Sequence, residues 1–235
     1  MAIKFGTKAE TLERIAALDT SFQIPQLFYF SVSQWHDQRK SLLEKIGFLF
    51  SKLIAVRSSA KGEDGKIKSM AGAYLTRLSV DPSQSENVEK AISDVIYSYS
   101  GADERDQVLI QTMATNVTIS GVIMTRNLDD GAPYYVINYD DKSEKVDSVT
   151  GGTHVCKTVL VYRHYKEDYF DSLRVKQMVG LARALEGICG SVPLDIEFGI
   201  GTDGESYLFQ ARQISTTHKW HLEIEQKLSM KISFV

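Results

Sequence analysis

Residues 193–212, PLDIEFGIGTDGESYLFQAR, contain two runs of alternating apolar and polar side chains around an Asp-Gly pair. Alternation with a period of two is typical of β-strands. Asp203-Gly204 is a sequence favoured in the two-residue type I′ turns of hairpins. The sequence therefore predicts an antiparallel hairpin in which Thr202 faces Glu205.

This register predicts which side chains share a face of the hairpin. Glu197 is expected directly across from Gln210. Asp195 is expected across from Arg212, on the same face. The opposite face is predicted to be a core face, made of Leu194, Ile196, Phe198, Phe209 and Ala211. Leu208 falls on the polar side, so we expect that side to form a pocket wall rather than open surface.

Two interpretations of the polar face remain open. Carboxylate and amide oxygens, such as those of Glu197 and Gln210, suit Mg²⁺, which usually keeps waters and shares phosphate oxygens. Arg212 could bind a terminal phosphate in a bidentate manner. The alternative is an ion pair between Asp195 and Arg212 on a wet face, which is common and weakly stabilising.

A second stretch, residues 55–80, also has the pattern of an anion-binding site. An apolar strand runs into Arg57, a charged glycine-rich loop follows, and Ser-Met-Ala-Gly at 69–72 precedes another strand. An arginine at a strand end, facing small residues across a loop, suits an anionic ligand such as a nucleoside triphosphate.

The first helix is expected to begin near Thr7, because Thr7 and Glu10 have capping-box spacing. Lys8 then lies in the first turn, where a cation works against the helix dipole. It is either a solvated lysine or a lysine that faces a phosphate together with free backbone N–H groups.

The whole chain predicts an α+β fold with largely antiparallel sheets, because the connections are short. Strands are expected at 26–33, 53–58, 73–80, 107–113, 118–125, 133–140, 157–163, 193–200 and 205–211, and further helices at 34–52, 84–99 and 167–188. We expect two lobes, approximately 1–110 and 111–215. The tail at 216–235 ends in LSMKISFV, which alternates like a strand.

Composition excludes several classes of protein. The chain has 235 residues, 43% of them hydrophobic, which is enough to bury a core. A net charge of −3 provides no field that attracts nucleic acid or a membrane. Cys156 and Cys189 are too far apart in sequence to suggest a zinc site or a disulfide framework. The N-terminus lacks an apolar signal region, so we expect a soluble cytoplasmic protein.

Six segments, in order from about residue 5 to 214, resemble the ATP-grasp nucleotide-binding domain of phosphoenolpyruvate synthase, pyruvate phosphate dikinase and related phosphotransferases. They are FGTKAETLERI, AVRSSAKGED, SMAGAYLTRLSV, VLIQTM, GVIMTRN and DIEFGIGTDGESYLFQAR. The family has Gly-Gly-Lys at the first, Val-Arg-Ser-Ser-Ala at the second, and Asp-Ile-Glu…Gln-Ala-Arg at the last. The resemblance implies an ATP-grasp-like fold of two lobes, forming a single nucleotide-binding domain over residues 1–235.

The resemblance also implies a role for each matching residue. Lys8 and Arg57 would contact the phosphates of ATP. Glu197 and Gln210 would hold Mg²⁺, and Arg212 would reach the terminal phosphates. Arg57 and Arg212 would thus act in phosphoryl transfer. The other implied nucleotide contacts are Ser69, Ala71 and Gly72, in a loop over the phosphates, and Gln111, Thr112, Met113 and Ala114, in a hinge whose backbone groups face adenine.

The chain also departs from the family pattern. Thr7 replaces the second glycine of the opening, and its Cβ limits backbone approach, so we expect an altered pocket rather than a lost one. The stretch between Lys8 and Arg57 is shorter than usual. Family members pass phosphate to a histidine on a separate swivelling domain, which has no counterpart here. Residues 151–154, Gly-Gly-Thr-His, match that histidine motif only in part, so His154 is either a phosphoacceptor or a surface-loop histidine.

Two classes of function follow from these observations. The first is a catalytic part that binds Mg-ATP and presents a phosphoryl group to a histidine on another domain or chain. A small-molecule acceptor would then receive the phosphate: pyruvate, a drug hydroxyl or an amide. The alternative is a non-catalytic ATP-binding regulatory module or remnant. A carboxylate–amine ligase on the same fold fits the order of the motifs less well.

Overall fold

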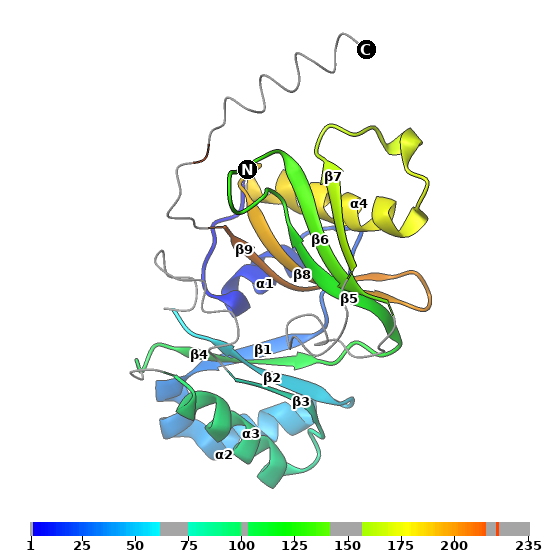
Figure 1. Ribbon diagram of the computed structural model, residues 1–235. Coiled ribbons are helices and arrows are strands. Elements are labelled where there is room, and N and C mark those ends of the chain that lie inside the picture. Colours follow the sequence, from blue (N-terminus) through cyan, green and yellow to red (C-terminus); the bar gives the residue numbers. More distant parts are fainter. Residues whose placement is uncertain (1, 62–74, 100–102, 142–156, 215–219, 221–235) are drawn as a thin grey trace. The chain divides into compact units, whose positions relative to one another are not determined.

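The structure, a computed structural model, describes residues 2–61, 75–99, 103–141, 157–214 and 220. The chain divides into two compact units. The N-terminal unit comprises Lys4–Asp19 and Ile24–Thr115, and the C-terminal unit comprises Met1–Ile3, Thr20–Gln23 and Asn116–Val235. Each unit contains one antiparallel sheet with helices beside it, so the predicted α+β class is confirmed (Figure 1).

The N-terminal unit has a four-stranded sheet in the order β1-β4-β2-β3. Its elements are α1 (Lys8–Ala16), β1 (Leu27–Ser31), α2 (Val32–Leu49), β2 (Ile54–Ser59), β3 (Thr76–Val80), α3 (Ser85–Tyr97) and β4 (Gln107–Thr112). Helices α2 and α3 cover one face (Figure 1). Phe30, Val56 and Ile110 are buried in that core together with Trp35 and Ile92 of the helices. Since strand residues alternate, the neighbouring Arg57 and Gln111 lie on the opposite face.

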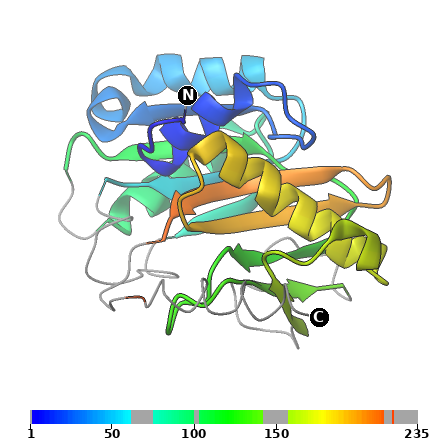
Figure 2. The same cartoon turned by 90° about the horizontal axis from the view of Figure 1, so that it is seen from above.

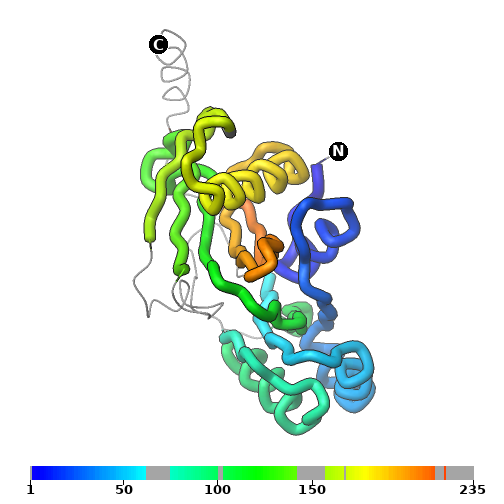
Figure 3. Tube along the Cα trace, turned by 90° about the vertical axis from the view of Figure 1, so that its right-hand side faces the viewer, coloured from blue at the N-terminus to red at the C-terminus, as the bar shows by residue number. Residues whose placement is uncertain are grey.

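The C-terminal unit has a five-stranded sheet in the order β7-β6-β5-β8-β9. Its elements are β5 (Val117–Met124), β6 (Tyr134–Asp140), β7 (Lys157–Tyr162), the 3₁₀ helix η1 (Glu167–Tyr169), α4 (Leu173–Cys189), β8 (Leu194–Gly201) and β9 (Ser206–Gln213). Helix α4 crosses one face, beside β8 and β9 (Figures 2 and 3). Ile137, Ile123, Ile196 and Ala211 are cross-strand partners in one row, and each is buried.

The hairpin of β8 and β9 has the predicted pairs of Glu197 with Gln210 and of Asp195 with Arg212, but its turn differs from the prediction. Gly201 N–H donates to the Glu205 carbonyl (2.9 Å) and Gly204, at φ +82°, lies in the left-handed region. The loop therefore has three residues, and the predicted type I′ turn is wrong. A β-bulge between Glu197 and Phe198 adds one residue to β9 and restores the predicted register beyond it.

Because of the bulge, Leu208 and Phe209 lie on the opposite faces of the sheet from those predicted. Leu208 pairs with Phe198 and therefore lies on the α4 face, not on the polar face. Phe209 lies on the polar face, since its ring occupies the space that a Cβ of Gly199 would need and stacks on Tyr207. Both side chains are buried. The predicted place of Leu208 on the polar face is therefore wrong, and Phe209 lies on that face instead.

Helix α4 starts at Leu173 rather than near residue 167, because Ser172 caps it by accepting the N–H of Val175. The expected strand at the end of the tail lies outside the described residues. Within the described ranges, no helix is long and apolar enough to cross a membrane.

Gly121 of β5 lies so close to the neighbouring strand that we expect a side chain there to destabilise the fold. A Cβ there would lie 2.3 Å from the carbonyl oxygen of Asn138, a backbone atom of the neighbouring strand. We expect Gly121→Ala to lower the free energy of unfolding by about 1–3 kcal/mol, measured by urea denaturation. Gly187→Ala is the control: nothing lies within 4 Å of its Cβ on α4, so stability should rise by about 0.5–1 kcal/mol. Equal effects of the two substitutions would contradict the steric explanation.

Candidate functional site

The face of the C-terminal sheet opposite α4 carries the polar residues of the hairpin. Glu197 pairs with Gln210, and Asp195 pairs with Arg212, as the sequence predicted. Gln210 is 4% exposed, whereas Glu197 is half-buried. One carboxylate and one amide therefore lie side by side on a largely buried polar face.

Gln210 supplies the observation that tests whether a metal fits here. Its Oε1 is buried and has no hydrogen-bond partner among the described residues. An unsatisfied buried oxygen is costly, so such an atom points to a ligand that is bound during function. Beside the carboxylate of Glu197, this oxygen fits Mg²⁺, which binds through one or two protein oxygens and shares phosphate oxygens. No cluster of three or more His, Cys, Asp or Glu that could hold a metal occurs in the described part of the chain.

Asp195 and Arg212 form an ion pair on this same face. Arg212 Nε and Nη2 lie 2.7 and 2.6 Å from Asp195 Oδ2. The ion pair of the alternative interpretation therefore forms, but the side chains of Asp195 and Arg212 are only 9% and 19% exposed, so the expected wet face is wrong. The ion pair holds the guanidinium in place beside Glu197 and Gln210.

The N-terminal unit brings Arg57 and Gln111 together on the sheet face opposite α2 and α3. Arg57 Nη1 donates to Gln111 Oε1 at 3.5 Å. Gln111 is 2% exposed, and its Nε2 has no hydrogen-bond partner among the described residues. The sequence predicted only backbone contacts at Gln111 and missed this donor. The sequence feature that could have revealed it is the position of Gln111 within the apolar run VLIQT, which suggests a buried amide.

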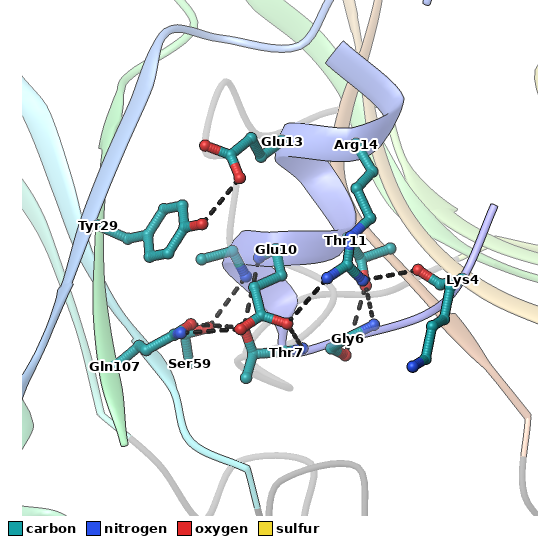
Figure 4. Close-up of polar contacts among 11 residues, drawn as sticks. Lys4, Gly6, Thr7, Glu10, Thr11, Glu13, Arg14, Tyr29, Ser59 and Gln107 are labelled. Carbon is teal, nitrogen blue, oxygen red and sulfur yellow. Dashed lines mark hydrogen bonds and ion pairs between the residues drawn. The ribbon is translucent and has the colours of Figure 1, made fainter. Parts of the chain in front are cut away.

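Helix α1 packs against β1 and β4 and begins close to this face (Figure 4). The predicted capping box of Thr7 and Glu10 is confirmed, and Thr7 Oγ1 also donates to Gln107 Oε1 at 2.5 Å. Thr7 has φ −63°, so its Cβ causes no strain. Replacement of the family glycine therefore leaves the start of the helix intact.

Lys8 is only 9% exposed, so the alternative of a solvated lysine is wrong. Ala9 N–H donates to Ser59 Oγ (3.0 Å), which places the first turn of α1 beside β2, two residues from Arg57. The N–H groups of Ala9 and Glu10 already have acceptors, so the predicted free N–H groups are not available there. A contact of this turn with phosphate would therefore have to come from Lys8.

The predicted hinge, Gln111–Ala114, begins with the last two residues of β4, and its backbone is partly hydrogen-bonded; Gln111 is buried and the other three residues are half-buried. Thr112 N–H donates to the Gln26 carbonyl and Met113 N–H to the Leu53 carbonyl, both at 2.9 Å. Ala114 N–H donates to no acceptor among the described residues. Of the N–H groups of Thr112, Met113 and Ala114, that of Ala114 is thus the one without an acceptor among the described residues.

Several predicted residues cannot be placed. Ser69, Ala71, Gly72, His154 and Cys156 lie outside the described residues. Those that can be placed divide between the units: Lys8, Arg57 and Gln111–Ala114 belong to the N-terminal one, and Glu197, Gln210 and Arg212 to the C-terminal one. Cys189 is buried, and burial, with the nearby charge of Glu186, raises the pKa of its thiol to about 11. It is an inert core residue.

Comparisons with known proteins give structural likeness only. No protein-family model matches the chain, and neither does a curated protein. Among solved structures, D-alanine–D-alanine ligase from Helicobacter pylori is 12% identical with a TM-score of 0.48, over 88% of this chain and 54% of the ligase. VanG D-Ala:D-Ser ligase from Enterococcus faecalis is 12% identical with a TM-score of 0.47, over 94% and 55%.

The RimK domain protein ATP-grasp from Sphaerobacter thermophilus is 11% identical with a TM-score of 0.46, over 96% of this chain and 62% of that protein. The chain thus spans about half the length of the ligases that it matches. At these TM-scores we derive no function from the likeness.

Proposed function

We propose that this chain binds Mg-ATP and forms the nucleotide-binding part of an ATP-grasp-like phosphotransferase that resembles phosphoenolpyruvate synthase. The observation that carries the proposal is that the buried Oε1 of Gln210, across from Glu197, has no hydrogen-bond partner among the described residues. It is supported by the buried Lys8 and by Arg57 in the N-terminal unit, since both are cations that suit phosphate.

In the proposed mechanism the protein mainly positions and neutralises phosphate. Glu197 and Gln210 would hold Mg²⁺, which when bound offsets charge on the phosphates. Lys8 and Arg57 would orient the triphosphate, and Arg212 would stabilise the charge of the group in transfer. The nucleophile would be a histidine of another domain or chain, so no general base is required from this chain. The phosphate would then pass to a small-molecule acceptor.

A non-catalytic ATP-binding module is the second candidate function. It is favoured by the ion pair of Arg212, because both Nε and Nη2 are already engaged by Asp195. In that case Arg212 would stabilise the hairpin rather than contact phosphate. Arg212→Ala would then lower the stability of the fold and leave the affinity for ATP unchanged.

Calorimetric titration with a non-hydrolysable ATP analogue, with and without Mg²⁺, tests the proposal. We expect binding that requires Mg²⁺ and is weakened about 10–100-fold by Arg212→Ala, since charge-assisted bonds contribute about 1.5–3 kcal/mol. A folded, monodisperse protein that binds no analogue would overturn the proposal. Mg²⁺-dependent binding that is unaffected by Arg212→Ala would favour the non-catalytic module.

A further inference from the structure

Thr125 connects the end of β5 to the start of β8. Its N–H donates to the carbonyl of Leu194 (2.9 Å), and its Oγ1 accepts the N–H of Leu194 (2.8 Å). Thr125 is completely buried. One residue therefore satisfies both backbone groups of Leu194 and fixes the backbone at this position.

Leu194 directly precedes Asp195, the acid that holds Arg212. Successive residues of a strand point to opposite faces. Leu194 is buried on the α4 face, and Asp195 therefore emerges on the polar face, where its Oδ2 accepts from Arg212 Nε at 2.7 Å. A shift of the Leu194 backbone would move the carboxylate and, with it, the guanidinium.

The backbone carbonyl of Thr125 accepts a hydrogen bond from Arg163, which belongs to a buried ion pair on the α4 face. Arg163 Nη1 donates to the Thr125 carbonyl (2.8 Å) and pairs with Glu186 of α4. Tyr135 donates its O–H to the other oxygen of Glu186 at 2.8 Å. Burial, followed by the charge of Glu186, raises the pKa of Tyr135 to about 12, so the phenol stays a donor.

We propose that Thr125 is a positioning residue that relays the arrangement of Arg163 and Glu186 on one face of the sheet to Asp195 and Arg212 on the other. Arg212 is thereby held in place for a terminal phosphate, a role that rests on the proposed function. Thr125 belongs to the segment GVIMTRN, for which the family resemblance supplied no residue role. The benefit is pre-organisation, because a cation placed in advance need not be ordered during the reaction.

The first test does not need a nucleotide. Thr125→Val keeps the shape of the side chain but removes the acceptor for Leu194 N–H, whereas Thr125→Ser keeps it. We expect hydrogen exchange of the Arg212 Nε–H, followed by ¹⁵N NMR, to be about tenfold faster in Thr125→Val than in the unaltered protein. Thr125→Ser should restore the slow exchange.

Ile137→Val is the matched control. Ile137 is completely buried in the same sheet but is not one of the residues that link Thr125 to Arg212. The substitution should therefore lower stability without moving Arg212. Equal acceleration of exchange in Thr125→Val and Ile137→Val would show a general loosening and overturn the proposal, as would unchanged exchange in Thr125→Val. Thr125→Ala, which also lacks the acceptor, replaces Thr125→Val if that variant does not fold.

The second test measures the affinity for the Mg²⁺ complex of the ATP analogue. We expect about tenfold weaker binding in Thr125→Val and unchanged binding in Ile137→Val. Unchanged binding in Thr125→Val would overturn the link from Thr125 to phosphate. If the unaltered protein binds no nucleotide while Thr125→Val still accelerates the exchange of Arg212, the positioning role stands and the proposed function falls.

Discussion

Replacement of Glu197 by alanine is expected to abolish Mg²⁺-dependent nucleotide binding and to leave the fold intact. Glu197 is the half-buried carboxylate directly across from Gln210, whose oxygen has no partner among the described residues. Without the carboxylate, one neutral amide oxygen would remain, and Mg²⁺ would stay with its waters. We expect the calorimetric affinity for the Mg²⁺ complex of an ATP analogue to fall about 100-fold or more, because even outer residues of metal sites contribute 10–100-fold.

Glu205→Ala is the matched control for this experiment. Glu205 belongs to the same hairpin but is exposed beside its turn, so its removal should change neither binding nor stability. Circular dichroism and thermal unfolding check that both variants are folded. Retention of Mg²⁺-dependent affinity by folded Glu197→Ala would show that the metal, if one binds, is held elsewhere.

The pairing of Glu197 with Gln210 was predictable, although for an incomplete reason. The sequence predicts a two-residue turn at Asp203-Gly204, whereas the loop has three residues. The three-residue loop shifts the pairing of the two strands by one residue, and the bulge in β9 shifts it back. Alternation alone cannot reveal a bulge, and for that reason Leu208 and Phe209 were assigned to the wrong faces.

Some local signals were sufficient for a correct prediction, whereas no signal marked certain long-range partners. The capping box of Thr7 depends on a residue three positions away, and it forms as predicted. The hydrogen bond between Tyr135 and Glu186 joins residues 51 positions apart and depends on how α4 packs on the sheet. No pattern in one sequence marks such a partner. The buried side chain of Gln111 was also missed: its place in the apolar run VLIQT suggests burial, but its contact with Arg57 depends on the neighbouring strand.

Replacement of Glu186 by alanine is expected to cause a large loss of stability. The side chains of Glu186 and Arg163 are 8% and 15% exposed, so they form a buried ion pair. Removal of one partner leaves an uncompensated charge in the interior. We expect Glu186→Ala to lower the free energy of unfolding by about 3–5 kcal/mol, measured by urea denaturation. Glu186→Gln keeps an acceptor for Tyr135 and should cost less.

A double-mutant cycle separates the loss of the pair from the loss of packing. Glu186→Leu leaves the Arg163 charge behind and Arg163→Met removes that charge, so combining these two single substitutions should recover most of the stability. The recovery is expected because a buried ion pair is often no more stabilising than apolar side chains of similar volume. If the double variant is as unstable as the sum of its single variants, the two charges are not coupled. The cost of Glu186→Ala would then come from lost packing and from the unsatisfied hydroxyl of Tyr135.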